Sequence, residues 1–106
     1  MIDFQKIEGF EWDEGNARKN EKHGVTQVEA EQVFINKPLL VLSDEKHSLS
    51  ETRLHALGKT NAERLLHVTF TLRSAAAEGL KIRIISARSM HVKERRIYEQ
   101  ETETNT

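Results

Sequence analysis

Arginine and histidine recur among apolar residues in the second half of the chain, where Arg53, His67 and Arg83 each lie in a segment of alternating character. Arginine can contact two phosphate oxygens at once, and a histidine that titrates near neutral pH can take up or release a proton. Cleavage of RNA without a metal ion needs a base for the ribose 2′-hydroxyl, stabilisation of the charged phosphate, and a proton for the departing 5′-oxygen. These side chains could supply all three.

A structural interpretation stands beside the chemical one. An arginine on a sheet face is more often a solvated or salt-bridged surface residue than a catalytic group. His67 follows Leu65 at a spacing that would also suit a core position. Residue types alone therefore leave both interpretations open.

The net charge of −1 conceals a separation of charge along the sequence. Residues 53–98 contain ten lysines and arginines but only three glutamates, whereas residues 1–52 contain six basic and eleven acidic residues. A basic block that folds into one sheet and helix can present a positive face to an anionic partner. The alternative is a solvated surface of mixed charge.

Length and composition bound the answer. A chain of 106 residues with 37% hydrophobic and 31% charged residues predicts one globular domain, which we place at residues 1–100, with a polar tail at 101–106. There is no cysteine and no long apolar run, so we expect a cytoplasmic protein without a disulfide, signal peptide or membrane segment. The five histidines lack the helical His-x-x-x-His spacing of a metal site, so we expect neither a metal nor a cofactor.

Capping signals predict two helices in the first half of the chain. Asp13 is placed as the N-cap of a helix over residues 14–22, which Gly24 would end. Thr26 and Glu29 form a capping box before a second helix that reaches Asn36. Residues 90–100 predict a third helix, with Ser89 as its N-cap.

Four apolar segments lie between the second and third predicted helices, at residues 39–42, 53–58, 64–72 and 80–88. Their short connections favour an antiparallel meander. The predicted fold class is thus α+β, with two N-terminal helices packed on an antiparallel β-sheet and then a C-terminal helix.

Burial predicts the register, because a slip of one residue turns every apolar side chain outward. We expect Phe70 opposite Ile82 on the core face. The other face would then carry two neighbouring rows across the three main strands, one of Arg53, Thr69 and Arg83 and one of His55, His67 and Ile85, with the C-terminal helix covering part of it.

The sequence Arg-Ile-Ile-Ser-Ala-Arg at 83–88, followed by Glu94-Arg95 and Tyr98-Glu99, resembles the C-terminal motif of the BrnT family. Matching motifs extend upstream to Phe10-Glu11-Trp12-Asp13-Glu14, Lys22-His23-Gly24-Val25 and Asp44-Glu45 with His47. The resemblance implies a RelE-like fold and a metal-independent ribonuclease that inhibits translation as the toxin of a type II pair. It also implies a BrnA-like antitoxin protein as partner, with DNA contacted only through that antitoxin.

The resemblance and the predicted rows together select the candidate site. His47 lies on a loop in the family's Asp-Glu-x-His pattern, and Arg88 matches the last arginine of the motif. His55 departs from the family, which usually has an apolar residue there, so we leave it out of the catalytic set. The catalytic candidates are Arg53, His67, Arg83, Arg88 and His47, and the RNA-binding candidates are Lys22, His23, Arg64, Lys81, Arg95 and Tyr98.

Two other functions stay open at this point. A non-catalytic RNA-binding module would use the basic block equally well, although the aromatic and glycine-rich motifs of common RNA binders are absent. A degenerate toxin that acts only as an antitoxin partner is the second. Structural roles are also open for individual residues: Lys22 and His23 could cap a helix, and Tyr98 could simply pack.

Overall fold

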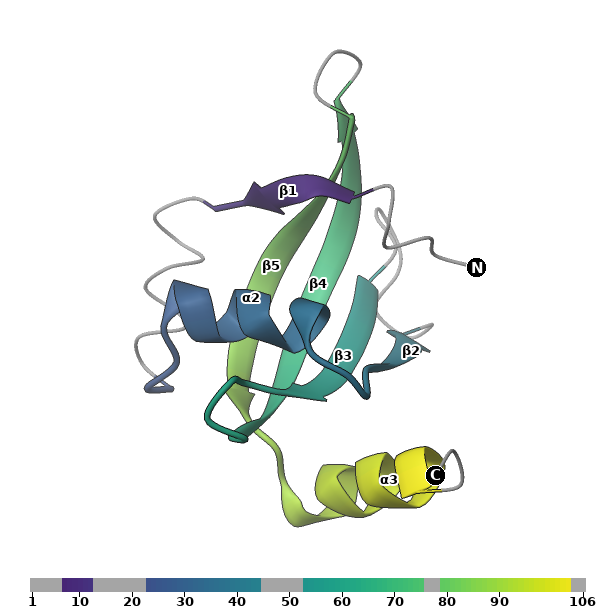
Figure 1. The fold of residues 1–106 in the computed structure, drawn as a ribbon. Helices are drawn as coiled ribbons and strands as arrows, with labels where there is room; N and C mark the ends of the chain where they lie inside the picture. The colour runs from purple at the N-terminus through teal and green to yellow at the C-terminus, as the bar shows by residue number, and fades with distance from the viewer. Residues whose placement is uncertain (1–6, 13–22, 45–52, 76–78, 104–106) are drawn as a thin grey trace.

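The computed structural model of the chain describes residues 7–12, 23–44, 53–75 and 79–103. Within them, strands and helices alternate irregularly along the chain (Figure 1). The elements are β1 (Ile7–Glu11), α2 (Gln27–Ile35), β2 (Leu40–Asp44), β3 (Arg53–Lys59), β4 (Leu65–Ala75), β5 (Gly79–Ser89) and α3 (Val92–Glu103).

The strands form one sheet in the order β1-β5-β4-β3-β2. Strands β2 to β5 make the predicted antiparallel meander, but β1 pairs with β5 in parallel, which makes the sheet mixed. The predicted arrangement of two N-terminal helices on an antiparallel sheet is therefore wrong: the described helices lie in the middle and at the C-terminus of a strand-rich α+β fold. The helix predicted over residues 14–22 lies outside the described residues.

The N-terminal strand joins the sheet because its apolar side chains gain burial there. Ile7 and Phe10 pack against the main core, and the rings of Phe10 and Phe34 lie 5.7 Å apart between centroids. Pairing also covers the edge of β5, whose backbone groups would otherwise face solvent. A strand of only five residues, two of them glutamate, does not reveal from sequence which strand it will pair with.

Helix α2 packs on one face of the sheet and builds the main core. Its capping box is confirmed, because Glu29 N–H donates to Thr26 Oγ1 while Thr26 N–H donates to a Glu29 carboxylate oxygen. Ala30 and Val33 are buried against alternate residues of β3, β4 and β5. A Cβ at Gly58 would lie 2.8 Å from Val33 Cγ1, so glycine is what allows α2 to approach β3 this closely.

In the first half of β5, the pairing with β4 differs from the prediction by two residues. Phe70 lies opposite Ile84, not Ile82. The ladder then shifts, since Thr69 pairs with Ser86 and Ile85 is left as the additional residue of a β-bulge. The bulge reverses the alternation of the last part of β5. As a result Arg88 comes to lie opposite His67, on the face away from α2.

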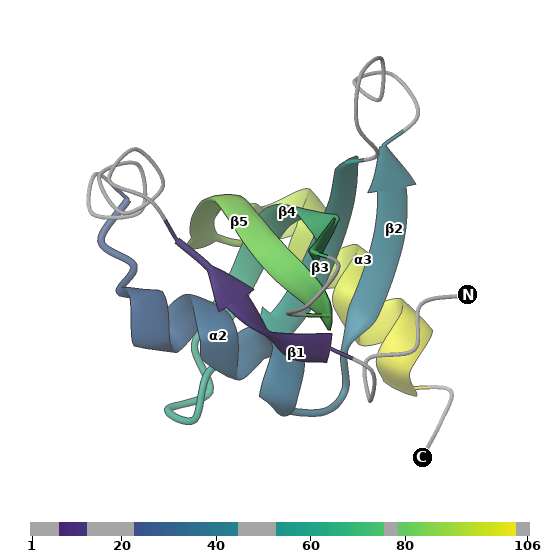
Figure 2. The same cartoon turned by 90° about the horizontal axis from the view of Figure 1, so that it is seen from above.

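Helix α3 lies on that second face, so the two helices are on opposite sides of the sheet (Figure 2). A smaller core holds it there, in which Leu57, Met90 and Tyr98 are buried and Leu40 and Leu65 pack around them. The predicted N-cap, Ser89, is wrong because β5 extends through it, and Met90 N–H still bonds to Leu65 C=O. In the described part of the chain no helix has the length and apolar character to cross a membrane.

Candidate active site

Side chains on the α3 side of the sheet form three rows across the strands. The row under α3 runs Leu40, Leu57, His67 and Arg88; the middle row runs Leu42, His55, Thr69 and Ser86. The third row holds Arg53 on β3 and, farther along, Thr71 on β4, Arg83 on β5 and Glu11 on β1. The predicted rows are therefore wrong in composition, although the arginines and histidines do share one face.

Two histidines meet where the first and middle rows adjoin. His55 Nδ1 lies 2.8 Å from His67 Nε2 and 3.1 Å from Thr69 Oγ1. The ring centroids are 4.9 Å apart with an interplanar angle of 60°. A single proton shared between the facing nitrogens accounts for the short distance, because two bare lone pairs at 2.8 Å would repel.

Glu94, in the first turn of α3, closes this network from above the sheet. Both Arg88 terminal nitrogens donate to its two carboxylate oxygens at 2.8 Å, a bidentate pair. His91 N–H donates to Oε1 at 2.8 Å, and His67 Nδ1 lies 2.7 Å from Oε2. That last oxygen lies off the direction of the ring N–H, so the contact is electrostatic rather than an aligned hydrogen bond.

Charge in the network is set by burial and by these contacts. Burial raises the pKa of Glu94, but hydrogen bonds from Arg88 and from His91 N–H outweigh it and lower that pKa to about 2. Burial lowers the pKa of His67; Arg88 and His55 lower it further, while Glu94 opposes them. At neutral pH the carboxylate is thus ionised and His67 is a neutral imidazole, able to serve as a base.

The arginines of the third row lie farther along the same face. Arg83 pairs with Glu11 at 3.3 Å, and its side chain is one-quarter exposed. Arg53 is half-buried on β3, and Lys81 is half-buried on β5, two residues before Arg83. This part of the face thus carries three basic side chains, and it lies beside the middle row that carries His55.

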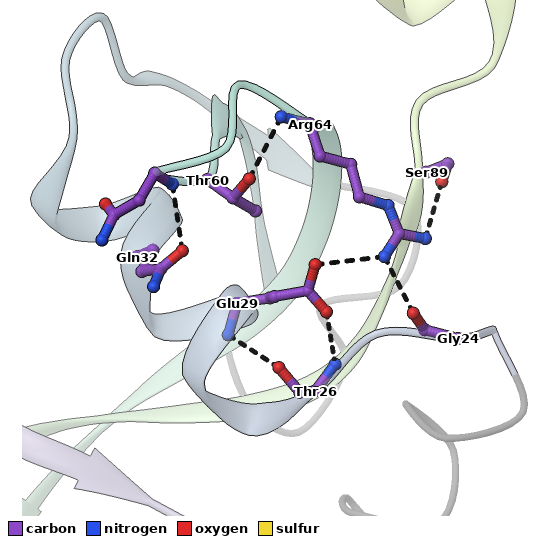
Figure 3. Close-up of polar contacts among 8 residues, drawn as sticks. Gly24, Thr26, Glu29, Gln32, Thr60, Arg64 and Ser89 are labelled. Carbon is purple, nitrogen blue, oxygen red and sulfur yellow. Dashed lines mark hydrogen bonds and ion pairs between the residues drawn. The ribbon is translucent and has the colours of Figure 1, made fainter.

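Arg64, a predicted RNA contact, is engaged in structural contacts instead of facing outward (Figure 3). Its guanidinium donates to Gly24 C=O at 2.8 Å, to Glu29 Oε2 at 3.2 Å and to Ser89 Oγ at 3.1 Å. It therefore ties the N-terminal end of α2 to the end of β5. Figure 3 shows Thr60 beside it, accepting from the backbone N–H of Arg64.

The other predicted RNA-binding residues are spread around the molecule. Tyr98 is 5% exposed and donates its hydroxyl to Pro38 C=O at 2.7 Å, so its ring offers no open stacking face; burial also raises its pKa. His23 is exposed in the turn before α2, and Arg95 is exposed on α3. Lys22 and His47 lie outside the described residues.

Two residues of the network were missed from the sequence. His55 has the right alternation with Arg53 and Leu57 but was set aside for departing from a family pattern. Glu94 gave a weaker signal: it stands at the third helical position, three residues after His91, where a capping-box glutamate belongs. Its contacts with β4 and β5 depend on how α3 packs, which no local pattern encodes.

An open pocket lies elsewhere, at the β3–β4 turn beside the end of α2, with a volume of about 480 Å³. It is polar, lined by Asn36, Lys37 and residues 59–63, and none of the network residues contributes to it. Asn36 ties its walls together through Lys59 C=O and Asn61 Oδ1. Across the described residues, no group of three or more His, Asp or Glu side chains could hold a metal ion.

Comparison with known proteins gives one family. Residues 12–94 match the sequence model of a family described as the ribonuclease toxin, BrnT, of type II toxin-antitoxin systems. The match spans most of the chain and ends at Glu94, so it includes the whole histidine network. No curated protein sequence matches. The chain belongs to the BrnT family of ribonuclease toxins.

Proposed function

We propose that this protein is a metal-independent endoribonuclease, the toxin of a type II pair, which inhibits translation in the cytoplasm until a cognate antitoxin neutralises it. Family membership gives the toxin class and ribonuclease activity. One observation carries the chemical part of the proposal: a pair of facing histidines joined to an arginine–glutamate pair, on the sheet face that also carries Arg53 and Arg83.

The proposed reaction uses the RNA's own 2′-hydroxyl. A histidine of the network takes the proton from that hydroxyl, the O2′–P bond forms, and the P–O5′ bond breaks. The departing 5′-oxygen takes a proton from water, leaving a 2′,3′-cyclic phosphate and a free 5′-hydroxyl. No metal is needed to lower the pKa of the nucleophile if a correctly placed base removes its proton during attack.

Arg83 and Arg53 are the groups we assign to the scissile phosphate. Arg83 already holds a carboxylate, Glu11, and the guanidinium geometry that fits a carboxylate also fits a phosphate. Charge on the phosphate oxygens grows in the transition state, so a donor aimed at them lowers the barrier. Lys81 and Arg95 would contact flanking phosphates, where they contribute affinity more than rate.

The antitoxin we propose is BrnA-like and covers this cationic face. It would present acidic or hydrogen-bonding groups to Arg53 and Arg83, and DNA would be contacted through the antitoxin alone. Electrostatic steering predicts association that slows as salt rises. Association that is fastest in high salt would contradict this description of the interface.

The test of the enzyme is single-turnover RNA cleavage at saturating protein in EDTA, with Arg83→Ala and Lys81→Ala as a matched pair on one strand. We expect Arg83→Ala to lose about a hundredfold in rate. Lys81→Ala should mainly weaken RNA binding and flatten its salt dependence. Equal losses of cleavage rate in the two variants would indicate that this face binds RNA but does not catalyse its cleavage.

Two outcomes favour the other functions. RNA that shifts in a gel but stays intact indicates a non-catalytic binding module. A protein inert toward RNA that still binds the antitoxin tightly indicates a degenerate toxin.

A further inference from the structure

We propose that the outer side of α3 binds the backbone of the RNA substrate through Lys93, Arg95 and Arg96, so that the substrate is an extended single strand. The inference rests on the proposed ribonuclease function and deepens it. Arg95, already assigned to a flanking phosphate, gains two neighbours, and the substrate class becomes an RNA that reaches beyond the nucleotides at the scissile bond. This surface lies on the far side of the helix turn whose inner side carries Glu94.

Residues 93–96 form one turn of α3 with an inner and an outer side. Glu94 faces the sheet, where its carboxylate binds an arginine of β5 at 2.8 Å. With 3.6 residues per turn, Arg96 lies nearly opposite that carboxylate. Lys93 and Arg95 lie on the two flanks, and all three basic side chains are exposed. A strand of RNA that leaves the histidine pair along either flank of α3 therefore meets a cation.

The charges on the exposed side of α3 run against the helix dipole. Cations stabilise a helix near its C-terminal end and anions near its N-terminal end. Here Lys93 stands in the first turn, whereas the last turn carries Glu101 and Glu103 and no basic residue. Lys93 and Arg96 are also three residues apart, a spacing at which two like charges on a helix repel. The positions of these cations thus lower the stability of α3 rather than raise it.

Contacts inside the protein do not account for the three cations either. Among the residues that the structure describes, none of their side chains takes part in an ion pair or a hydrogen bond. Arg95 stands four residues before Glu99 and yet does not pair with it, whereas Arg64 and Arg88 each bind a glutamate. Exposed cations without such contacts suit a polyanion, which gains affinity from the counterions that it releases at each neutralised phosphate.

The position of α3 favours a flexible single strand over a duplex. The helix stands on the sheet face that carries the histidine pair, at one end of the molecule (Figure 1). A substrate that contacts both the sheet face and the outer side of α3 has to bend around a helix about 10 Å across. A single strand whose backbone is tracked by spaced cations can do this.

The first test compares two double variants that remove the same charge. Lys93→Gln/Arg96→Gln changes α3, and Lys37→Gln/Lys59→Gln changes the β3–β4 turn as the matched control. Affinity for a long single-stranded 2′-O-methyl RNA, which lacks the nucleophile and is not cleaved, is measured over a range of salt concentrations. We expect the slope of log affinity against log salt to become shallower by about 1.4 in the α3 variant, about 0.7 for each lost phosphate contact, and to keep its wild-type value in the control. A wild-type slope in the α3 variant would overturn the proposal.

Thermal stability separates a binding role from a structural one. Because both removed cations oppose the helix dipole or each other, Tm of Lys93→Gln/Arg96→Gln should equal or exceed that of wild type while its RNA affinity falls. Circular dichroism measures Tm for all three proteins. A Tm that falls together with RNA affinity would show that these side chains support the fold, and would overturn the proposal.

Cleavage assays separate this inference from the proposed function. On a long RNA the α3 variant should show a higher KM but a rate at saturation within about threefold of wild type, because it loses affinity and not chemistry. On a dinucleotide, which is too short to reach the outer side of α3, it should match wild type in both constants. Equal losses on the two substrates would overturn the proposal.

The two proposals can fail separately. If wild-type protein cleaves no RNA, the proposed function is refuted, and the salt slopes still decide whether α3 binds RNA. If Lys93→Gln/Arg96→Gln weakens binding of the antitoxin but leaves RNA binding unchanged, the outer side of α3 belongs to the antitoxin interface and the inference is wrong.

Discussion

Both described helices begin with a capping glutamate that also binds an arginine, but the two arrangements have different further partners. Each helix carries a glutamate at its third position that accepts from the backbone N–H of the N-cap residue, Thr26 for α2 and His91 for α3. Each glutamate also binds an arginine from the sheet, Arg64 in one case and Arg88 in the other. In both helices the glutamate carboxylate satisfies a backbone N–H at the helix N-terminus and binds an arginine as well.

What differs is the third partner. Arg64 also donates hydrogen bonds to Gly24 C=O and Ser89 Oγ, and these bonds connect the start of α2 to the end of β5. Around Glu94 the third partner is His67, a group that can change protonation, and beyond it lies His55. An ion pair becomes a candidate for chemistry only when a titratable side chain is joined to it.

The largest expected difference is in RNA cleavage rate, between a variant that lacks Arg88 and one that lacks Arg64. Arg88→Met leaves Glu94 without its bidentate partner and His67 without a fixed carboxylate, so we expect RNA cleavage to fall about a hundredfold or more. Arg64→Met should leave the rate per folded molecule nearly unchanged. Single-turnover kinetics on both variants, with the folded fraction measured by circular dichroism, makes the comparison; a larger rate loss in Arg64→Met would reverse the assignment.

Arg64→Met should lower the free energy of unfolding even though it leaves the cleavage rate nearly unchanged. Its three hydrogen bonds connect elements far apart in sequence, and leaving their acceptors unsatisfied costs on the order of 1–3 kcal/mol. Urea unfolding of Arg64→Met measures this cost. An unchanged midpoint would show that the contacts in Figure 3 contribute nothing net.

Acid should lower the free energy of unfolding through Glu94 and His67, because the fold lowers the pKa of both groups. Glu94 has its pKa lowered from 4.5 to about 2, so its contribution is present above pH 4.5 and is lost as pH falls toward 2, up to about 3 kcal/mol. His67 also has a lowered pKa, so the unfolded chain takes up that proton first and stability begins to fall below pH 6.5. Glu94→Gln should flatten the lower part of this profile, which unfolding at pH 3 to 7 would reveal.

The smallest expected effect concerns the cap of α2. Thr26→Ala removes the hydroxyl that accepts from Glu29 N–H and should cost about 1 kcal/mol without altering RNA cleavage. Thermal unfolding checks the cost. A loss of catalytic rate greater than the loss of folded protein would mean that α2 is coupled to the site.

The sequence predicted the features that depend on local pattern. The capping box at Thr26, the four strands of the meander and the α3 segment all follow from residues near one another in the chain. The parallel pairing of β1 was missed because a short strand chooses its partner by tertiary burial. The bulge at Ile85 was missed because one unpaired residue leaves the apolar pattern upstream of it intact.

That bulge accounts for most of what could not be predicted in the site. Without it Arg88 would share the side of Ile84 and point toward the main core. With it Arg88 lies opposite His67 and reaches Glu94 on α3. The candidate arginines and histidines could therefore be named from sequence, but their pairing could not.

The matched glutamates provide the most direct test of the account. RNA cleavage in EDTA would be measured at saturating protein for wild type, Glu94→Gln and Glu29→Gln, each corrected for folded fraction. The account predicts that wild type and Glu29→Gln cleave at rates within about threefold of each other, while Glu94→Gln is slower by about a hundredfold or more, because the neutral amide no longer places a negative charge beside His67. Equal rates for the two variants would contradict the claim that the cluster of Glu94, Arg88 and His67 belongs to the active site.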